Sequence, residues 1–295
     1  MPYIDVRGVN HYYEWISDAK STDLSKPETG KPVMVFLHGW AGSTRYWEST
    51  ARALSPYLDC LLYDLRGFGR SLLTRPIQAE IDALGYELES YADDLALLLD
   101  QFGLDSVYLN AHSTGASIAT LFLNRYPARV ERAILTCSGI FEYDERAFEA
   151  FHTFGGYVVR FRPNWFLSIP FLERMFMARF LHRQIPGADQ RAFLEDFLKA
   201  DYEAAIGTIY TAVSKYAADT MPKEFARLSV PTLLISGQYD KIIPAEMGRQ
   251  AAALSDAVTH VVIPKTSHFP MLEDPPTYLK HVQEFLQAEA ASVTH

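Results

Sequence analysis

The chain has little of several features that mark specialised classes of protein. It holds only two cysteines among 295 residues, Cys60 and Cys137, too few for a disulfide framework. Both lie in apolar runs, so we expect them to be small residues of the core. Acidic residues outnumber basic ones: the chain has 36 aspartates and glutamates but 27 lysines and arginines, and its net charge is −9. This balance argues against a nucleic-acid partner.

Segments that export a protein or anchor it in a membrane are also lacking. The N-terminus, MPYIDVRGVN, has neither the basic region nor the apolar stretch of a secretory signal peptide. No apolar run reaches the roughly 18 residues that a helix needs to span a bilayer. We therefore expect a cytoplasmic protein without an integral membrane segment, while peripheral contact with a membrane surface stays open. The sequence does not indicate an oligomeric state.

Signatures of metal and phosphate chemistry are missing as well. No group of His, Cys, Asp and Glu has the spacing of metal ligands. No glycine-rich phosphate loop is present either. We therefore predict that the protein uses no metal and no cofactor. What remains is a composition of 48% hydrophobic and 21% charged residues, which is typical of a globular enzyme.

Apolar runs and helical patterns alternate along most of the chain. After two short strand-like runs, Tyr3–Val6 and His11–Ile16, six runs indicate strands that are buried on both faces. They are PVMVFLHG, CLLYDLRGFG, SVYLNAHS, RAILTCSG, PTLLISGQYD and HVVIPKTSH. Helical stripes lie between them at Tyr91–Phe102 and Ala116–Tyr126, and after them at Pro276–Ala288. This order predicts an α/β fold with a mostly parallel central sheet flanked by helices.

The alternation breaks once, between residues 140 and 221. This segment lacks a strand pattern and is rich in aromatic residues at helical spacings. We predict that residues 140–221 form an inserted helical cap, and that residues 1–139 and 222–295 form the core. Most of the cap aromatics are expected to pack in the cap's own interior. The remaining apolar surface is expected to face the mouth of a site.

Three residues suited to nucleophilic catalysis follow three of the expected strands. Ser113 lies between a strand and a helix in YLNAHSTGAS, among small residues, as in a tight turn that exposes a hydroxyl. Asp240 follows TLLIS and His268 follows HVVI, so each residue falls at the C-terminal end of a parallel strand. A serine that only caps a helix would look the same by itself. The three residues in this order instead predict a nucleophile, an orienting acid and a general base.

Over nearly its whole length the chain resembles the α/β-hydrolase-fold family. HGWAG is similar to the family's oxyanion-loop motif, DLRGFGRS to its loop after the fourth strand, and AHSTGA to its nucleophile elbow. The resemblance implies that the backbone N–H groups of Trp40 and Thr114 form the oxyanion hole. The family usually has glycine where this chain has Ala111. Because alanine is the next smallest residue, we expect the elbow to form nonetheless.

Four other titratable residues lie close to the predicted site in sequence. His38, in the HGW loop, and Asp64, at a strand end, are expected to shape their loops by hydrogen bonding. His112 precedes the nucleophile and is expected to pack or hydrogen-bond beside the elbow. Glu142 follows RAILTCSG, where some family members carry their triad acid, so it is the alternative to Asp240.

These features together predict a serine hydrolase that cleaves a small apolar carboxylic ester. Trp40, Phe141 and Phe269 are expected to bind the substrate, because all three are adjacent in sequence to predicted site residues or strand ends. A serine at the elbow argues against the epoxide hydrolases and haloalkane dehalogenases of this fold, which use aspartate. Three alternatives stay open: a cofactor-free perhydrolase (non-haem haloperoxidase), a carbon–carbon bond hydrolase, and a non-catalytic small-molecule receptor.

Overall fold

An eight-stranded sheet forms the centre of the molecule. The structure, a computed structural model, describes residues 2–18, 27, 29–73 and 84–287. The strands are β1 (Tyr3–Val6), β2 (Val9–Ile16), β3 (Val33–Leu37), β4 (Asp59–Tyr63), β5 (Val107–His112), β6 (Val130–Thr136), β7 (Thr232–Gly237) and β8 (Val258–Ile263). Their order in the sheet is β1-β2-β4-β3-β5-β6-β7-β8. Strands β3 to β8 are parallel, while β1 and β2 are antiparallel additions at one edge. The predicted mostly parallel sheet is confirmed.

The continuous apolar runs are explained by cores on both faces of the sheet. Successive side chains of a strand point to opposite faces. In β3, Val33, Val35 and Leu37 join one buried cluster, whereas Met34 and Phe36 join the other. A strand covered on both faces therefore needs apolar residues at every position.

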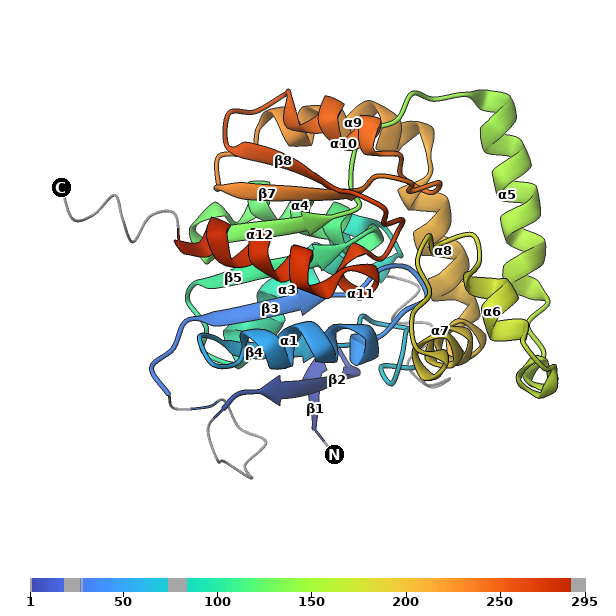
Figure 1. Cartoon of the computed structure of the whole chain (residues 1–295), viewed down its shortest axis with the longest axis horizontal. Helices are drawn as coiled ribbons and strands as arrows, with labels where there is room; N and C mark the ends of the chain where they lie inside the picture. The colour runs from blue at the N-terminus through green and yellow to red at the C-terminus, as the bar shows by residue number, and fades with distance from the viewer. Residues whose placement is uncertain (1, 19–26, 28, 74–83, 288–295) are drawn as a thin grey trace.

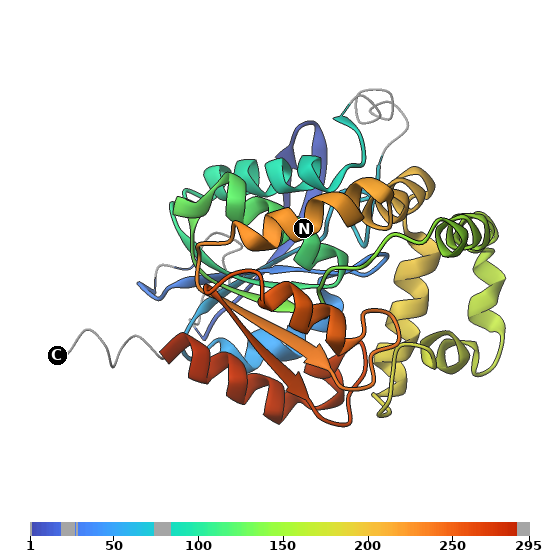
Figure 2. The same cartoon turned by 90° about the horizontal axis from the view of Figure 1, so that it is seen from above.

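Helices cover both faces of this sheet (Figures 1 and 2). One face carries α1 (Glu48–Leu54) and α12 (Pro275–Gln287), with the short α11 (Pro270–Glu273) and the 3₁₀ turn η1 (Thr44–Trp47) beside them. The other carries α3 (Leu88–Gln101), α4 (Thr114–Arg125), α9 (Lys215–Ala226) and α10 (Ala245–Ala252), and the turn η2 (Pro127–Arg129) follows α4. The three predicted helices correspond to α3, α4 and α12. The expected last residue of the third, Ala288, lies outside the described residues.

All of the regular secondary structure described between β6 and β7 is helical. It contains α5 (Glu145–Arg160), the 3₁₀ turn η3 (Asn164–Ser168), α6 (Leu172–Met177), α7 (Gly187–Lys199), α8 (Tyr202–Ala212) and α9. Helices α5 to α8 lie together beyond the C-terminal ends of the parallel strands (Figure 1). By contrast, α9 packs against α4 and α10 of the core. The predicted boundary at residue 221 falls inside α9, and the division into core and cap stays a prediction.

None of the helices in the described part of the chain combines the length and the apolar character that crossing a membrane requires.

Candidate active site

The site is built around the turn between β5 and α4. Ser113 occupies this turn with φ 54° and ψ −122°, a conformation that residues with a Cβ atom seldom adopt. Its own N–H donates to the carbonyl of Thr136 at the end of β6, 2.9 Å away. The strained backbone is therefore held from the neighbouring strand, and it presents the Ser113 side chain at the C-terminal edge of the sheet.

Small residues on either side allow this turn to approach its neighbours. A Cβ atom at Gly115 would lie 2.4 Å from the carbonyl oxygen of His38, so only glycine fits there. Ala111 is fully buried in β5, beside Leu37 of β3 and Leu135 of β6. The elbow thus forms with alanine at the position where the resemblance leads one to expect glycine.

A chain of two hydrogen bonds joins Ser113, His268 and Asp240. The Oγ of Ser113 lies 3.1 Å from Nε2 of His268, and Nδ1 of His268 lies 2.8 Å from Oδ2 of Asp240. The other carboxylate oxygen accepts the N–H groups of Ile242 and Ile243 at 2.8 and 3.1 Å. Burial alone would raise the pKa of Asp240, but its interactions with His268 and these two N–H groups hold it below the ordinary value.

This arrangement determines which nitrogen of His268 carries the proton. An ionised Asp240 only accepts hydrogen bonds, so it stabilises a proton on Nδ1 of the neutral imidazole. Nε2 is then free to accept the hydroxyl proton of Ser113. Glu142, the alternative acid, has an exposed side chain, and the carboxylate that contacts His268 belongs to Asp240.

A second histidine, His112, forms a hydrogen bond with the main chain of His268. Nε2 of His112 lies 2.7 Å from the main-chain carbonyl of His268, and Nδ1 lies 3.1 Å from the hydroxyl of Tyr46. A carbonyl can only accept, so His112 carries its proton on Nε2 and Tyr46 donates to Nδ1. The Tyr46 oxygen in turn accepts the N–H of Gly39. Burial, and then the nearby His268, lower the pKa of His112 well below its ordinary value, which keeps it neutral.

The loop after β3 lies directly against Ser113. A Cβ atom at Gly39 would lie 3.1 Å from the Cβ of Ser113 and 3.0 Å from Nδ1 of His112. Within the described chain, neither the N–H of Trp40 nor that of Thr114 donates to another residue. Thr114 is the first residue of α4, where helix amides lack partners. Both predicted oxyanion donors are therefore unbonded, and that assignment stays a prediction.

Two buried polar residues hold the loops around this site, in the roles predicted for them. His38 donates from Nδ1 to the carbonyl of Gly39 at 2.8 Å and accepts the N–H of Leu65 at Nε2, at 2.9 Å. It thereby ties the loop after β3 to the loop after β4. Asp64 accepts the N–H groups of Thr44 and Arg70, at 2.7 and 2.8 Å, one at each carboxylate oxygen.

Aromatic side chains surround the predicted base. Phe269 is buried, and its ring packs on those of His112, at a centroid distance of 4.7 Å, and Phe193, at 4.6 Å. Trp40 is half-buried, and its Nε1 donates to the carbonyl of Ala205 in α8, 2.8 Å away. Phe141 is half-buried and packs against the core cluster on the α3 and α4 face. The three predicted substrate-binding residues thus lie in different packing environments, and their role stays a prediction.

Sequence reasoning missed three residues that contact this site. Tyr46 belongs to η1, and Phe180 and Phe197 come from the helical insertion. The carbonyl of Phe180 accepts the N–H of His268 at 2.9 Å, and its ring centroid lies 6.1 Å from that of His268. The ring of Phe197 lies 5.9 Å from that of Trp40. No local motif indicates such contacts, because that of Tyr46 joins η1 to β5, and those of Phe180 and Phe197 depend on how the insertion folds back over the sheet.

Ser113, Asp240 and His268 do not line either of two hollows on the surface of the described molecule. One, of about 530 Å³, runs along α5. The other, of about 310 Å³, lies between α7 and the loops after β3 and β4. Its charged walls are largely paired, as in the bond of Arg45 to Glu195 at 3.0 Å.

Three side chains capable of binding a metal also meet here, but their ligand atoms are already engaged. Those of His112, Cys137 and His268 lie within 4.8 Å of one another. Both ring nitrogens of each histidine are hydrogen-bonded. Burial, and then the carboxylate of Asp240, raise the pKa of the Cys137 thiol well above its ordinary value. Because metals bind the thiolate, this donor set is a poor metal site.

Comparison with known proteins identifies the family of this fold. The family model for the alpha/beta hydrolase fold matches residues 32–275. The chain belongs to the alpha/beta hydrolase fold family. Among its relatives is a pimeloyl-[acyl-carrier protein] methyl ester esterase of Aeromonas salmonicida, 26% identical over 86% of this chain and 95% of the relative. A non-heme haloperoxidase of Rhodococcus erythropolis is 26% identical over 81% of this chain and 86% of the relative.

A solved structure shows the same fold at lower identity. The thermophilic esterase of Thermogutta terrifontis superposes with a TM-score of 0.73 at 23% identity, covering 98% of this chain and 99% of the esterase. At this identity the likeness concerns the fold alone. Members of one fold differ in chemistry, so function has to be argued from the site.

Proposed function

We propose that this protein is a serine hydrolase that cleaves carboxylic esters of apolar substrates through an acyl-enzyme intermediate. The observation that carries the proposal is the hydrogen-bonded chain from Ser113 through His268 to Asp240 at a strained turn. A serine used only as a helix cap requires neither the strain nor the histidine. Strain of this kind is retained where it positions a reacting group.

The reaction follows from the roles of these side chains. Nε2 of His268 takes the Ser113 proton as Oγ attacks the ester carbonyl carbon. The negative charge that develops on the carbonyl oxygen is bound by the N–H groups of Trp40 and Thr114. One such donor stabilises the transition state by about 3 kcal/mol. The C–O bond then breaks, and His268 passes its proton to the departing alcohol.

Deacylation repeats the same steps with water. His268 takes a proton from a water molecule, whose oxygen attacks the acyl carbon bound to Ser113. The serine leaves with the proton from His268, and the carboxylic acid is released. Throughout the cycle Asp240 stays ionised and stabilises the imidazolium, which agrees with its lowered pKa.

The aromatic surroundings support an apolar substrate. The rings of Phe180 and Phe269 contact the ring of the predicted base, and that of Trp40, in the predicted oxyanion loop, contacts Phe197 of α7. Pockets for small molecules are usually apolar with a few placed polar groups. This favours an ester whose acyl or alcohol part is a hydrocarbon over one that carries a phosphate.

Labelling and turnover together test the proposal. We expect a fluorophosphonate to label the protein covalently, and nitrophenyl esters to be hydrolysed. The Ser113→Ala variant should lose both, while its circular dichroism spectrum stays unchanged. Ser117→Ala, one turn further along α4, is the matched control and should keep both. Full labelling of Ser113→Ala would show that another serine is the nucleophile and overturn the assignment.

The same assay separates the alternatives. A non-catalytic receptor would be labelled slowly or not at all and would show little ester turnover. A perhydrolase, which the similarity to a haloperoxidase keeps open, would form peracid from an ester and hydrogen peroxide faster than it forms acid. A carbon–carbon bond hydrolase would prefer a vinylogous diketone to every simple ester.

A further inference from the structure

Helix α5 carries apolar residues on two of its faces. One face packs inward against α8, where the His152 ring stacks on Tyr210 at 4.1 Å and Val159 is buried. The other face turns away from the protein. On it Phe154, Tyr157 and Phe161 follow one another at helical spacing, and they are 72%, 68% and 64% exposed. An apolar stripe on a surface helix normally faces the core, so this one lacks a covering partner within the described chain.

More large apolar residues are exposed in η3 and at the start and in the middle of α6. Trp165, Phe171 and Met175 are 57%, 72% and 71% exposed. Phe171 also has φ 62°, a left-handed conformation that is unfavourable for an aromatic residue. We call the six residues Phe154, Tyr157, Phe161, Trp165, Phe171 and Met175 the α5–α6 patch. Large exposed apolar patches on soluble proteins usually mark sites that bind another protein, a membrane or a ligand.

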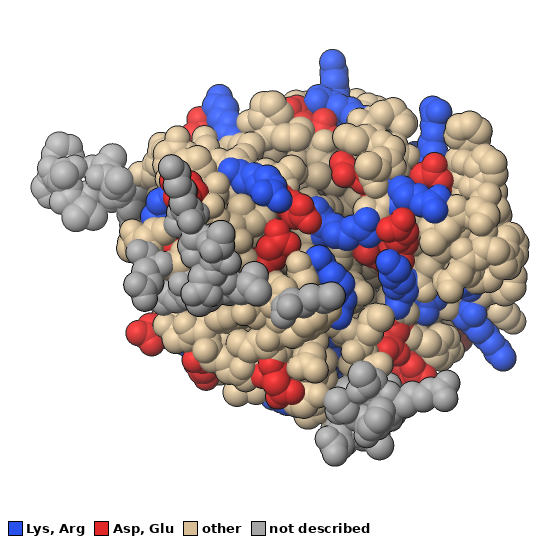
Figure 3. Space-filling model, turned by 90° about the horizontal axis from the view of Figure 1, so that it is seen from below, with Lys and Arg blue, Asp and Glu red and all other residues tan. Residues whose placement is uncertain are grey.

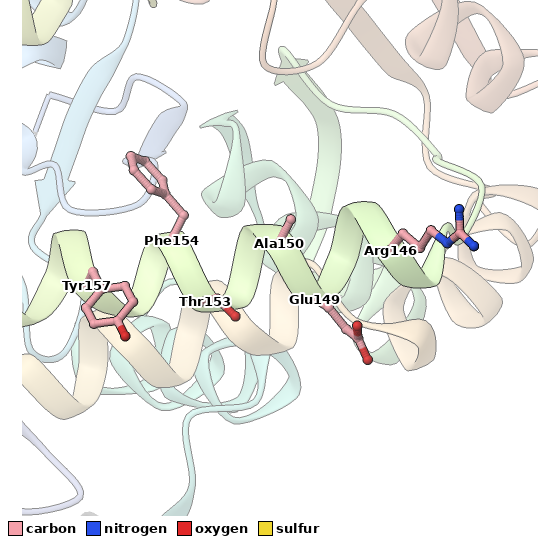
Figure 4. A pocket seen from close by; sticks show the side chains of 6 residues that line it. All are labelled: Arg146, Glu149, Ala150, Thr153, Phe154 and Tyr157. Atoms are coloured by element: carbon pink, nitrogen blue, oxygen red, sulfur yellow. The ribbon is translucent and has the colours of Figure 1, made fainter.

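A hollow of about 530 Å³ adjoins one end of the α5–α6 patch. All of its lining residues come from α5, including Phe154 and Tyr157 (Figure 4). A single helix cannot enclose a ligand, because the hollow has no opposite wall. It therefore fits an extended partner that lies along the helix better than a small molecule that must be surrounded.

The charge of this region differs from that of the whole chain. Residues 145–188, from the start of α5, contain six arginines and three glutamates, a net charge of +3, whereas the whole chain carries −9. Arg160, Arg174 and Arg179 are exposed and form no ion pair within the described structure. Figure 3 shows a broad uncharged surface at the right-hand end of the molecule, where α5 lies in Figure 1. Aromatic side chains with basic residues beside them are typical of helices that lie in a membrane interface.

We propose that the α5–α6 patch docks on the surface of a bilayer that contains anionic phospholipids. The aromatic rings enter the boundary between headgroups and acyl chains, and the three unpaired arginines contact the headgroups. A second copy of this chain fits less well, because a twofold contact through the patch would bring like-charged arginines together. The docking concerns the surface alone and does not depend on the proposed hydrolysis.

Vesicle flotation tests this docking. We use full-length protein carrying Ser113→Ala, so that no lipid is consumed, with vesicles of phosphatidylcholine alone or mixed with phosphatidylglycerol. We expect binding to the mixed vesicles that weakens as salt is raised, and much weaker binding to phosphatidylcholine. Phe154→Ser, Trp165→Ser and Phe171→Ser combined should lower the partition coefficient at least tenfold. Arg160→Gln, Arg174→Gln and Arg179→Gln should each lower it about fivefold on the mixed vesicles only.

Matched controls lie away from the patch. Tyr57→Ser removes an aromatic residue that is 62% exposed. Arg52→Gln, Arg227→Gln and Arg249→Gln combined remove three guanidinium groups that are 64%, 66% and 64% exposed. Both controls should bind vesicles like the parent. Trp165, the most exposed of the four tryptophans, should also give a blue fluorescence shift on binding that Trp165→Phe abolishes.

Three results would overturn the proposal. The first is an absence of binding to both kinds of vesicle, and the second is equal binding by parent and patch variants. The third is a dimer in sedimentation velocity that the combined patch variant converts to monomer, which would assign the patch to a second copy. Retained hydrolysis of soluble esters by the same patch substitutions in a chain with Ser113 intact would show that they spare the active site.

Discussion

Nε2 of His112 lies 2.7 Å from the main-chain carbonyl oxygen of His268, although the two residues are 156 positions apart in the chain. This bond is one end of a buried relay. From His112 it continues to the hydroxyl of Tyr46 and then to the N–H of Gly39 in the loop that lies against Ser113. The relay therefore couples the position of the predicted base to that of the predicted oxyanion loop.

The first prediction concerns Tyr46 as a positioning residue. Tyr46→Phe removes both bonds of its hydroxyl and leaves the buried N–H of Gly39 and Nδ1 of His112 unsatisfied. We expect kcat to fall about tenfold or more with KM little changed, and the free energy of unfolding to fall by about 1–3 kcal/mol. Tyr278→Phe is the matched control, because that hydroxyl is also buried and bonded, 2.9 Å from Asn110. It should lose similar stability but keep kcat, and an equal loss of kcat in both variants would reduce Tyr46 to a purely structural role.

The second prediction is a loss of stability in mild acid. Burial lowers the pKa of both His112 and His38, so both are neutral in the folded protein. In the unfolded chain a histidine titrates near 6.5. As the pH falls below that value, these two histidines bind protons in the unfolded state but stay neutral in the folded state. The stabilising contribution is thus fully present above pH 6.5 and is lost progressively below it.

Denaturant titrations between about pH 7.5 and pH 5 measure this slope. His112 and His38 should each add up to about 1.4 kcal/mol of lost stability per pH unit. His112→Gln should therefore reduce the slope of the wild-type stability curve by the contribution of one histidine. Parallel curves for wild type and His112→Gln would mean that His112 does not resist protonation in the folded state.

The fold was largely predictable because its strands are covered on both faces. Every position of β3 and of β4 is buried, and such strands leave continuous apolar runs in the sequence. Helix α4 was predicted from Ala116 but begins at Thr114. Its first two residues, Thr114 and Gly115, belong to the elbow and are not apolar, so the pattern that predicts the helix starts two residues later.

The site was predictable only where a residue follows a strand. Ser113, Asp240 and His268 each lie just beyond the end of a parallel strand, so the topology alone brings them to one edge. Tyr46 has no such mark, because it lies in a short 3₁₀ turn and reaches His112 by a long-range contact. Phe180 contacts His268 through a main-chain carbonyl, which any residue type would supply.

The third prediction decides between the two candidate acids. Asp240→Asn should lower kcat by about 10⁴-fold, because an amide that donates to Nδ1 favours the wrong tautomer of His268. Glu142→Gln should change kcat less than twofold, since its side chain is exposed and His268 contacts Asp240 instead. Both variants should stay folded by circular dichroism. A crippled Glu142→Gln beside a mild Asp240→Asn would reverse the assignment.

The fourth prediction concerns the alanine that replaces the usual glycine of the elbow. Ala111 is fully buried between β3 and β6. Ala111→Gly removes a packed methyl group and frees the unfolded chain, so we expect a loss of about 1 kcal/mol in the free energy of unfolding. Because Ser113 is held by Thr136 and by the close approach of Gly115, kcat should change little. A more stable or markedly more active Ala111→Gly would mean that the alanine strains the turn.

The fifth prediction concerns the length of the acyl chain. If aromatic side chains around His268 bind the hydrocarbon part of the substrate, each further buried methylene stabilises the transition state by at most about 0.8 kcal/mol, or about fourfold. We expect kcat/KM on nitrophenyl esters to rise with acyl length until the pocket is full. A profile that is highest at acetate and falls with every added carbon would instead mean that the aromatics pack on one another and close the site.

Trp40→Phe extends this test to the surrounding helices. The indole Nε1 donates to Ala205 of α8, 2.8 Å away, while the main-chain N–H is the predicted oxyanion donor. Phenylalanine keeps the main-chain donor and an aromatic ring but loses the bond to α8. We therefore expect kcat on acetate to stay within about twofold, and kcat/KM on the longest good ester to fall about five- to tenfold through KM, as one partly buried hydrogen bond is lost. An equal loss on all esters, expressed in kcat, would show that the indole positions the oxyanion loop rather than the contact with α8.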